Sequence, residues 1–590
     1  MSISIKRLPG IRSWRRCPHG LLHLRERGEV KDQRGDAIIL VLIAAVFILM
    51  LPLILVSTAV SALPAAQSDT NYNRAMAAID AGVSDYLNRL NQASVDQAPN
   101  YWQYSSSNLP PDSNAAFTGW VPVPGSPNEY FHYNTVGAAT SKTGDVVLDV
   151  NGYSNTGSPA VERTARVTFR TDGFLDYLLL TDKSLVDPAL ANVDNSGLSV
   201  SQAEKYCNYR WDQANPYSST GYGPNMSKCS GVLNYYVSGQ VFNGPVLSND
   251  LYYLNGAPTF NSPIYSANTQ PSGNPASPFW TDPTCSPSPS PCPGDGPVFN
   301  SSPSSIQSHA ILTFPATDSS LKTIAQTSGC LYEGPTSIQL YSDGKMSVSS
   351  PESAPNSACI GATPHAQISL PPNGVIYVEN APSGSIPVDC PVTIEHYDYG
   401  GSNPPCGTGD AFIKGALSGQ LTVAADNNVY ITGDLEYVGC AKSGTSDVLG
   451  LIANGFVYVS RYFVITNSAA YDICGAAPSH PLHDPVIYAA MLALQHSFAV
   501  DKFWSDKVNG TPYEIYINGS LAGEYADIEG TFNSSTGNII DGYLTNYSYD
   551  NRLQYLSPPY FLSGVGSAWK QANFAEIFNP AAATLPNVPS

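Results

Sequence analysis

The feature that most constrains this chain is a run without charge near its start. Residues 37–68 contain no Asp, Glu, Lys or Arg. The apolar part of the run extends from Ala37 to Val56 and includes Ile38, Leu40 and Pro52. About 20 apolar residues in a helix cross the hydrocarbon core of a bilayer, and proline is tolerated in such helices. The run therefore predicts a transmembrane helix.

Charge is distributed unevenly on the two sides of this run. Residues 1–35 carry nine Lys or Arg and three acidic residues, whereas the whole chain has a net charge of −19. Because positive residues stay on the cytoplasmic side, the pattern predicts a single-pass protein with a cytoplasmic N-terminus and an extracytoplasmic bulk. The acidic balance argues against nucleic acid as a partner.

An amphipathic helix is predicted to continue beyond the apolar run. Apolar side chains recur at steps of three and four residues, which places them on one face of a helix. They are Tyr72, Met76, Ile79, Val83, Tyr86, Leu87 and Leu90.

Two segments carry a resemblance to a known family. Gly35 and Asp36, between the basic head and the apolar run, resemble the signal of type IV prepilins, and residues 74–90 resemble minor pilins of the PilX kind. The resemblance implies cleavage by a prepilin peptidase after Gly35, partners among other pilin-like subunits, and a location at the cell surface or on a pilus. Major pilins carry Glu at the fifth mature position, where this chain has Leu40. That departure implies a minor rather than a major subunit.

An ordinary secretory signal, or an uncleaved membrane anchor, is an alternative interpretation of the same region. Small residues at 60–62 and 64–66 offer cleavage sites of the usual kind. N-terminal sequencing distinguishes the two signals, since the prepilin signal leaves Asp36 first and the secretory signal leaves Gln67.

The rest of the chain is predicted to be mainly β. Residues 145–150 and 165–170 alternate apolar and polar side chains, as a hairpin does, and from residue 233 short apolar runs alternate with Gly, Asn and Pro. We expect an irregular right-handed β-helix, with a β-sandwich as the alternative. Scattered segments of 174–570 also resemble large pilin-like envelope proteins, which implies a β-helical exported part.

These patterns predict four regions. They are a basic cytoplasmic leader (1–35), a hydrophobic pilin-like helix (36–92), a pilin-like β-hairpin region (93–175) and an exported β-helical region (176–590) with a Pro/Ser-rich excursion at 271–305.

Ten of the eleven cysteines follow the apolar run, and an even number in an exported chain indicates disulfides. Pairing of neighbours is our hypothesis, because spacing alone does not fix connectivity, and free buried thiols are the alternative. The pairs would be Cys207–Cys229, Cys285–Cys292, Cys330–Cys359, Cys390–Cys406 and Cys440–Cys474.

Motifs for catalysis, metals and cofactors are weak. The segment His480–Asp484, with its two histidines, could bind a metal, but no third ligand is evident. Residues 426–428 match only part of a calcium loop. A glycan-cleaving enzyme would need clustered acids, for which composition offers only Asp434, Glu436, Asp447 and Asp527. We therefore predict no enzyme activity, no cofactor and no metal.

Tyrosine is abundant, with 36 residues, and could act in two ways. Exposed tyrosines bind sugars or proteins, whereas buried ones fill the edges of stacked strands, and we favour the second. The tyrosines in question are Tyr235, Tyr236, Tyr252, Tyr253, Tyr543, Tyr547, Tyr549, Tyr555 and Tyr560.

Taken together, these patterns and the resemblance predict a structural subunit of a type IV pilus or pseudopilus-like machine. The alternatives are a membrane-anchored adhesin that binds surface glycans or proteins, and a carbohydrate-active β-helix enzyme.

Overall fold

The structure is a computed structural model. It describes residues 34–92, 101–110, 113–136, 145–155, 160–190, 199–207, 229, 232–268, 279–282, 285–288, 296–303, 305–353, 359, 367–382, 406–460, 473–475, 484–503, 513–533, 539–565 and 568–578. The chain divides into two compact units, residues 1–70 with 157–159 and residues 71–156 with 160–590.

The longest element is helix α1, Arg34–Gln92, with 59 residues. From residue 71 onward one stripe of the helix is buried, and it includes Ala75, Ile79, Tyr86 and Leu90 at helical spacing. Of the predicted apolar stripe, Ile79, Val83, Tyr86 and Leu90 are buried, while Tyr72, Met76 and Leu87 are half-buried. The opposite stripe is exposed and polar or small.

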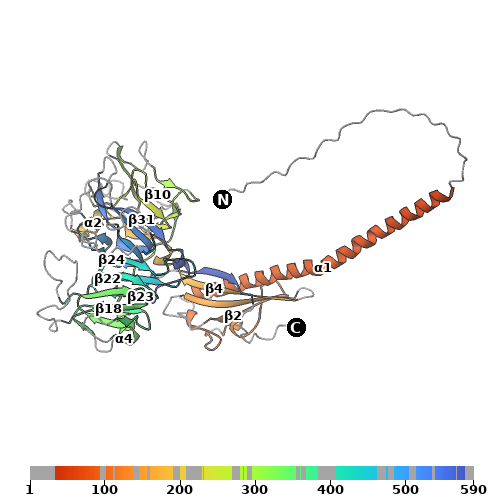
Figure 1. The fold of residues 1–590 in the computed structure, drawn as a ribbon, viewed down its shortest axis with the longest axis horizontal. Coiled ribbons are helices and arrows are strands. Elements are labelled where there is room, and N and C mark those ends of the chain that lie inside the picture. Colours follow the sequence, from red (N-terminus) through yellow and green to blue (C-terminus); the bar gives the residue numbers. More distant parts are fainter. Residues whose placement is uncertain are drawn as a thin grey trace. The chain divides into compact units, whose positions relative to one another are not determined.

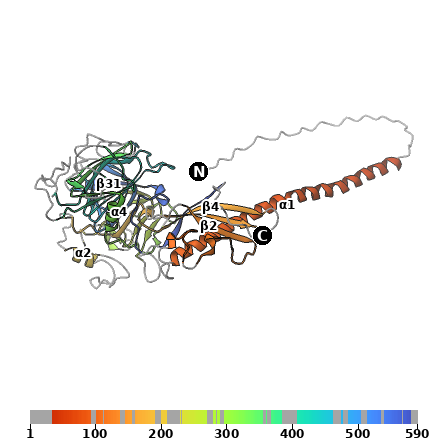
Figure 2. The ribbon, with the colours of Figure 1, turned by 90° about the horizontal axis from the view of Figure 1, so that it is seen from below.

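A five-stranded antiparallel sheet covers the buried stripe of α1 (Figures 1 and 2). Its strands, in order, are β1 (Val121–Pro122), β2 (Glu129–Thr135), β3 (Asp145–Ser154), β4 (Val161–Thr171) and β32 (Trp569–Glu576). Alternation along β3 directs Val146, Leu148 and Val150 into the core shared with the helix. We call residues 71–171 together with β32 the helix–sheet module.

The remaining strands form two further sheets, which make up the body of the protein, residues 172–568. A four-stranded sheet contains β6 (Tyr236–Val237), β9 (Tyr253–Asn255), β12 (Phe279–Asp282) and β13 (Cys285–Ser288). A 23-stranded sheet contains β5 (Leu179–Lys183), β7 (Val241–Asn243), β8 (Val246–Ser248), β10 (Thr259–Phe260), β11 (Ile264–Ser266), β14 (Val298–Phe299), β15 (Gln307–Ser308), β16 (Cys330–Glu333), β17 (Thr336–Tyr341), β18 (Lys345–Ser349), β19 (Glu352–Ser353), β20 (Ile368–Ser369), β21 (Val375–Glu379), β22 (Ala411–Leu417), β23 (Gln420–Ala425), β24 (Val429–Tyr437), β25 (Val448–Ala453), β26 (Val457–Val459), β27 (Val486–Ala493), β28 (Phe498–Val500), β29 (Tyr513–Tyr525), β30 (Gly530–Phe532) and β31 (Ile539–Tyr549). Short helices are α2 (Val200–Cys207), α4 (Ser319–Ser328), η1 (Tyr101–Gln103), η2 (Ala115–Phe117), η3 (Phe174–Asp176) and η5 (Asn551–Gln554).

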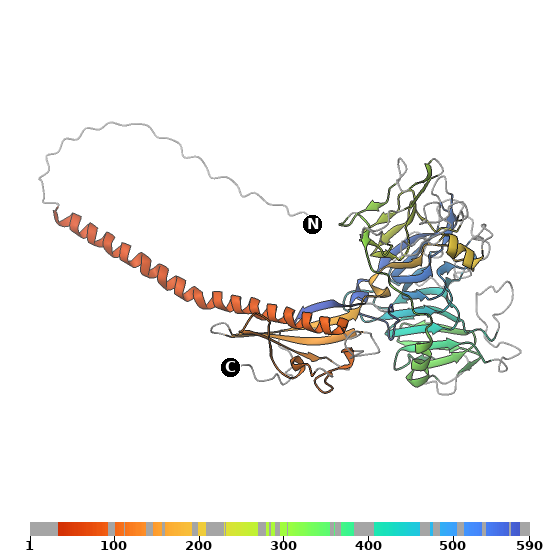
Figure 3. The ribbon, with the colours of Figure 1, turned by 180° about the vertical axis from the view of Figure 1, so that it is seen from behind.

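The large sheet is built mostly from parallel ladders, visible as successive layers of strands in Figure 3. One ladder runs β16–β21–β23–β25–β27–β29, and a second runs β17–β22–β24. Inward-facing Ile413, Val423 and Leu451 meet in one apolar core. On the other face of the first ladder, Tyr377 and Ile452 lie in a second core with α4 residues. Burial on both faces explains why these strands are almost continuously apolar.

The predicted fold class, a long transmembrane helix followed by an irregular right-handed β-helix, is wrong. Parallel ladders are mixed with antiparallel pairs such as β16–β19, β17–β18 and β18–β20, and a separate sheet is wholly antiparallel. Layered mixed sheets over shared cores are closer to the sandwich alternative. Short strands between turns are common to both architectures, so their spacing alone did not separate them.

The predicted single-pass localisation with a cytoplasmic N-terminus is also not supported. No helix within the described part of the chain is long and apolar enough to span a membrane.

Candidate functional site

The helix–sheet module is held together by polar contacts between α1 and the last strand, β32. The Tyr72 hydroxyl donates to Glu576 Oε2 at 2.8 Å, and the Arg163 guanidinium lies 4.2 Å from the Tyr72 ring centroid. Further along the helix, Asn91 Nδ2 donates to Trp569 O at 3.0 Å, and Trp569 N donates to Asn91 Oδ1 at 2.7 Å. The helix thus binds both ends of a strand that lies nearly 500 residues later in the sequence.

Aromatic packing fills the space beneath the helix. The buried Tyr86 ring contacts Tyr101, Phe117, Tyr133 and Phe169, with centroid separations between 5.3 and 6.2 Å. Burial raises the pKa of the Tyr86 hydroxyl, so this group stays neutral at any physiological pH. The cluster fixes the angle at which the helix lies on the sheet, because aromatic rings of this size have few alternative packings.

Two glycines allow this close contact. A Cβ on Gly152 would lie 2.0 Å from Ala75 O and 2.9 Å from Ile79 N, both of which belong to the helix backbone. A Cβ on Gly82 would lie 2.9 Å from Val150 Cγ1. The spacing between helix and sheet therefore depends on the lack of a side chain at both positions.

The first part of α1 presents the opposite situation. Eleven large apolar side chains from Ile38 to Met50 are each between 52% and 71% exposed. They surround the helix on every side, because residues 38–43 and 46–50 are consecutive. An exposed apolar surface of this extent marks an interaction site, and a helix apolar all round is normally enclosed by other helices.

The residues predicted for processing and for the apolar helix all lie in α1. Gly35, Asp36, Ala37, Pro52 and Val56 are part of its backbone. Ile38 and Leu40 are 63% and 71% exposed. Cleavage after Gly35 stays a prediction.

A charged cluster joins the helix–sheet module to the body. Arg170 of β4 pairs with Asp176, and Lys570 Nζ of β32 lies 2.8 Å from both Asp172 Oδ1 and Asp176 Oδ2. His309 Nε2 lies 3.2 Å from Asp172 Oδ2. Burial alone would raise the pKa of Asp172, but the hydrogen bond from His309 and the charge of Lys570 outweigh it, and the pKa is lowered. The cluster therefore carries charge in the folded protein.

Disulfides join Cys207 to Cys229, Cys330 to Cys359, and Cys440 to Cys474. Cys406 is also disulfide-bonded, while its predicted partner Cys390 lies outside the described residues. Of the remaining predicted pair, Cys285 begins β13 and Cys292 lies outside the described residues. The disulfides brace loops of the body, as expected for a chain in an oxidising compartment.

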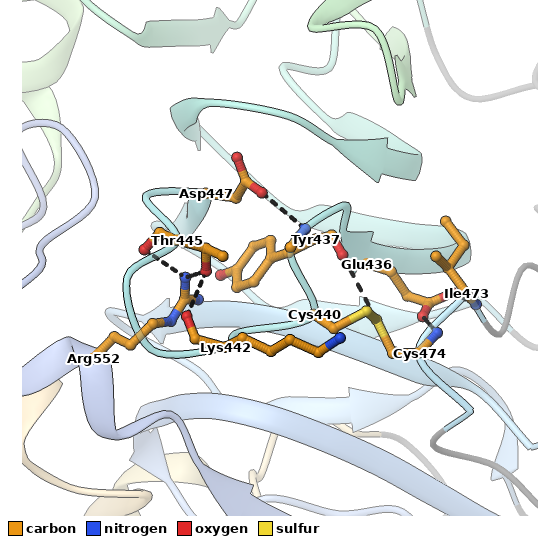
Figure 4. The surroundings of a disulfide bond; sticks show 10 residues. Glu436, Tyr437, Cys440, Lys442, Thr445, Asp447, Ile473, Cys474 and Arg552 are labelled. Carbon is orange, nitrogen blue, oxygen red and sulfur yellow. Dashed lines mark hydrogen bonds between the residues drawn. A yellow bond between two sulfur atoms is a disulfide. The ribbon is translucent and has the colours of Figure 1, made fainter.

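Figure 4 shows the surroundings of the Cys440–Cys474 disulfide. The Glu436 carboxylate accepts hydrogen bonds from Ile473 N at 2.9 Å and Cys474 N at 3.0 Å. On the other side of Tyr437, Arg552 Nη1 donates to Thr445 Oγ1 at 2.8 Å, and the guanidinium lies 5.2 Å from the Tyr437 ring centroid. The structure places these groups in a connected support for the disulfide-bonded loop.

Three of the four acids considered for catalysis bind backbone N–H groups, and the fourth is buried beside another acid. Asp434 Oδ1 accepts from Val486 N at 3.0 Å, and Asp447 accepts from Gly419 N at 2.8 Å and Gly439 N at 3.0 Å. Glu436 binds backbone amides as described above. Asp527 is buried next to Glu529 and Tyr547, and burial raises its pKa. The four are distributed over different strands and loops, and three of them bind backbone N–H groups.

The weak metal motifs are resolved only in part. His480 and His483 lie outside the described residues, while Asp484 Oδ1 accepts from Glu514 N at 3.0 Å. Asp426 accepts hydrogen bonds from the Tyr377 hydroxyl at 2.6 Å and Asn380 N at 2.8 Å. No cluster of three or more metal-binding side chains occurs in the part of the chain that the structure describes.

The turn at Asp426 also shows a pH-sensitive group that the sequence did not indicate. Asp318 is fully buried, and its Oδ1 accepts from Asn454 Nδ2 at 2.8 Å and lies 2.8 Å from the Tyr377 hydroxyl oxygen, whose single proton is donated to Asp426. Burial raises the pKa of Asp318 to about 7 in spite of these contacts. The folded protein therefore holds a proton that the unfolded chain releases near pH 4.

We expect the Asp318→Asn variant to be more stable than the wild type at alkaline pH. Because the folded state binds the proton more tightly, wild-type stability falls as the pH rises from about 4 to about 7. The amide oxygen can keep the hydrogen bond from Asn454 and its contact with Tyr377, and the amide does not ionise. Urea unfolding should show the variant more stable by about 1–3 kcal/mol at pH 8 and nearly equal at pH 4. The exposed Asp80→Asn serves as the control, and an equal gain at both pH values would contradict the assignment.

Most of the tyrosines considered for adhesion are buried. Tyr236, Tyr252, Tyr253, Tyr543, Tyr547 and Tyr549 have at most 7% of their surface exposed. Tyr235 and Tyr560 are half-buried, and Tyr555 is exposed. The structure thus places this set mainly in the core, where the rings pack between strands.

Comparison with known proteins adds little beyond the family resemblance. No protein-family model and no curated protein matches the chain. Among solved structures, the competence-associated pilin ComZ from Thermus thermophilus is similar at 13% identity, covering 85% of this chain and 97% of that one, with a TM-score of 0.27. A TM-score this low does not establish a shared fold.

Proposed function

We propose that this chain is a non-catalytic, pilin-like assembly subunit that packs the first part of α1 against the helices of other pilin-like subunits. The observation that carries the proposal is the contrast within one helix. Its second part is anchored to a sheet through Ala75, Ile79 and Tyr86, whereas its first part bears apolar side chains with no cover in the described structure. Similar helices supply apolar surfaces of matching length, so a bundle buries the surface that a lone helix leaves in water.

Leu40 supports the proposal that the chain is a minor rather than a major subunit of such an assembly. It stands where the resemblance places the Glu of major pilins, and its side chain is 71% exposed. A leucine cannot form an ion pair with the terminal amine of a neighbouring subunit, so a filament of this chain alone would lack that contact. We therefore propose that it assembles with other subunits, after a prepilin peptidase has cut after Gly35.

The body supports a display role in place of catalysis. Three of the four candidate acids bind backbone amides, and disulfides brace loops of the body. These hydrogen bonds and disulfides make the sheets of the body rigid. The helix α1 would carry this rigid body into the assembly.

The Ile43→Asp variant tests this function. One buried charge among apolar helices costs several kcal/mol, so we expect the variant to be lost from sheared filaments while it remains folded and present in cells. Gln67→Asp adds the same charge to an exposed polar position of the same helix and should assemble normally. Immunoblots of the filament fraction measure both variants, and N-terminal sequencing shows whether Asp36 is the first residue. Absence of the wild-type chain from filaments would contradict the proposal.

A further inference from the structure

One face of the large sheet carries two rows of side chains that are aligned across six parallel strands, β27, β29, β31, β7, β10 and β14. The first row is Val486, Tyr516, Asn546, Val241, Thr259 and Val298. The second row is Tyr488, Asn518, Ser548, Asn243, Asn261 and Asn300, where the last two follow their strands directly and continue the ladder through Asn261 N to Phe242 O and Asn300 N to Phe260 O. Residues between the two rows, such as Ile517 and Tyr547, belong to the core, and so do the β27 members of the rows, Val486 and Tyr488, which are 1% and 6% exposed. We call the two rows together the amide face.

A groove of about 390 Å³ lies at one end of the amide face. Tyr488, Tyr516, Asn518, Asn546 and Ser548 line it, together with apolar strand residues. Its volume is within the range of small-ligand sites, and its lining combines aromatic rings with amides and a hydroxyl. Rings can stack against the C–H faces of a ligand, while amides can bind its hydroxyl groups.

The second row extends this groove as a chain of amides. Asn300 Nδ2 donates to Asn261 Oδ1 at 2.7 Å, Asn261 Nδ2 donates to Asn243 Oδ1 at 2.6 Å, and Asn243 Nδ2 reaches Ser548 Oγ at 3.5 Å. The three asparagines are exposed, and each amide has further donor and acceptor capacity beyond these contacts. Asn518 Oδ1 is buried and has no hydrogen-bond partner among the described residues.

The charge around the groove selects against anions. Glu514 Oε2 accepts from Asn546 Nδ2 at 3.2 Å. Burial, a hydrogen bond to Glu514 and the charges of Glu514 and Asp484 raise the pKa of Tyr516, so its hydroxyl remains a neutral donor. No Lys or Arg lines the groove within the part of the chain that the structure describes. A phosphorylated, sulfated or uronic-acid ligand would meet repulsion here.

We propose that the amide face binds a neutral, linear polysaccharide, with a sugar ring on the half-buried Tyr516 and hydroxyl groups along the asparagine row. Repeating side chains, spaced at about 4.8 Å by the strands, match a polymer of repeating units better than a compact ligand. A peptide strand would need the edge of a sheet for its backbone, whereas this surface is the face of one. The proposal is independent of filament assembly, because none of its residues lies in α1.

Affinity electrophoresis of the full chain in gels that contain a soluble β-glucan, an α-glucan, a galactomannan or alginate tests the proposal. We expect at least one of the three neutral polysaccharides to retard the wild type and alginate to leave it unaffected. Tyr516→Ala should weaken binding at least tenfold. Asn261→Asp, which keeps the side-chain shape but removes donors at an exposed position, should weaken it at least fivefold. Thermal unfolding of each variant shows whether the fold is kept.

Matched controls make the outcome decisive. Tyr555→Ala removes an exposed tyrosine beyond the end of β31 and should bind like the wild type, as should the assembly variant Ile43→Asp. The proposal is overturned if no neutral polysaccharide retards the wild type, if alginate retards it equally, or if Asn261→Asp binds as tightly as Tyr555→Ala.

Discussion

The Gly152→Ala variant is expected to lose the packing of α1 on its sheet. A single methyl group at this position would lie 2.0 Å from Ala75 O and 2.9 Å from Ile79 N. Both are backbone atoms of the helix, so no side-chain rotation relieves the overlap. The helix must move away from β3, and the contacts of Tyr86 with Tyr133 and Phe169 are then lost.

The expected cost is about 3 kcal/mol or more, which is at the upper end of the range for overpacked cores. Urea unfolding followed by tyrosine fluorescence or circular dichroism measures it. Gly119→Ala is the matched control, because its nearest neighbour would be Ala115 O at 3.9 Å, and we expect a change within about 0.5 kcal/mol. A Gly152→Ala protein as stable as the Gly119→Ala protein would show that the helix does not lie against the sheet at this distance.

The sequence allowed the helix–sheet contact to be anticipated in part. Helical spacing identified Ile79, Val83, Tyr86 and Leu90, and these four are buried, because the period of an apolar stripe depends only on local geometry. The need for glycine at 152 could not be predicted. It arises from the approach of a segment about 75 residues away in the chain, which no local pattern records.

The direction of strand pairing was harder to predict than the strands themselves. Residues 145–150 and 165–170 were recognised by alternation, and they pair in β3 and β4 with Val150 opposite Ala165. In the body, the same short apolar runs are compatible with several layered arrangements, and long-range pairing decides between them. β29 illustrates this, since it pairs with β27 and β31, which are near it in the sequence, and also with β5 (Leu179–Lys183), which is far from it.

For the candidate site residues, too, local patterns were predictable from the sequence and long-range contacts were not. Acids such as Asp434 and Glu436 stood out by composition, but their hydrogen bonds to backbone amides became evident only from the fold. The asparagines of the amide face were not singled out, because Asn243, Asn261 and Asn300 belong to different turns in the sequence. Regular recurrence of Asn directly after or at the end of short apolar runs was the one available signal.

The position of β32 makes the body an insertion within the helix–sheet module. β4 ends at Thr171 and β32 begins at Trp569, and these two residues are direct antiparallel partners, as are Arg170 and Lys570. The module has its own apolar core, in which α1, β2, β3 and β4 participate and against which Trp569 and Phe574 pack. A chain of about 110 residues with such a core is large enough to fold alone.

We therefore expect a shortened chain, residues 71–171 joined through Asn-Gly to residues 569–578, to fold cooperatively. Adjacent antiparallel partners are the positions that a two-residue hairpin turn connects, and Asn-Gly favours the required turn. The shortened chain loses the ion pairs of Arg170 and Lys570 with Asp172 and Asp176, which lie at the border of the module and contribute little to its core. A single sigmoidal thermal transition and dispersed NMR signals of Tyr86 and Tyr133 would show the native packing.

A second shortened chain that stops at Thr171 separates folding of the whole module from folding of its parts. Without β32, the edge of β4 is unpaired, and the contacts of Tyr72 with Glu576 and of Asn91 with Trp569 are absent. This chain should unfold at a temperature lower by 10 °C or more, corresponding to about 2 kcal/mol in a domain of this size, or should aggregate through the open edge. If both shortened chains were unfolded, the module would need the body in order to fold. The body would then be inserted in the module's sequence, but the module would not be an independently folding unit.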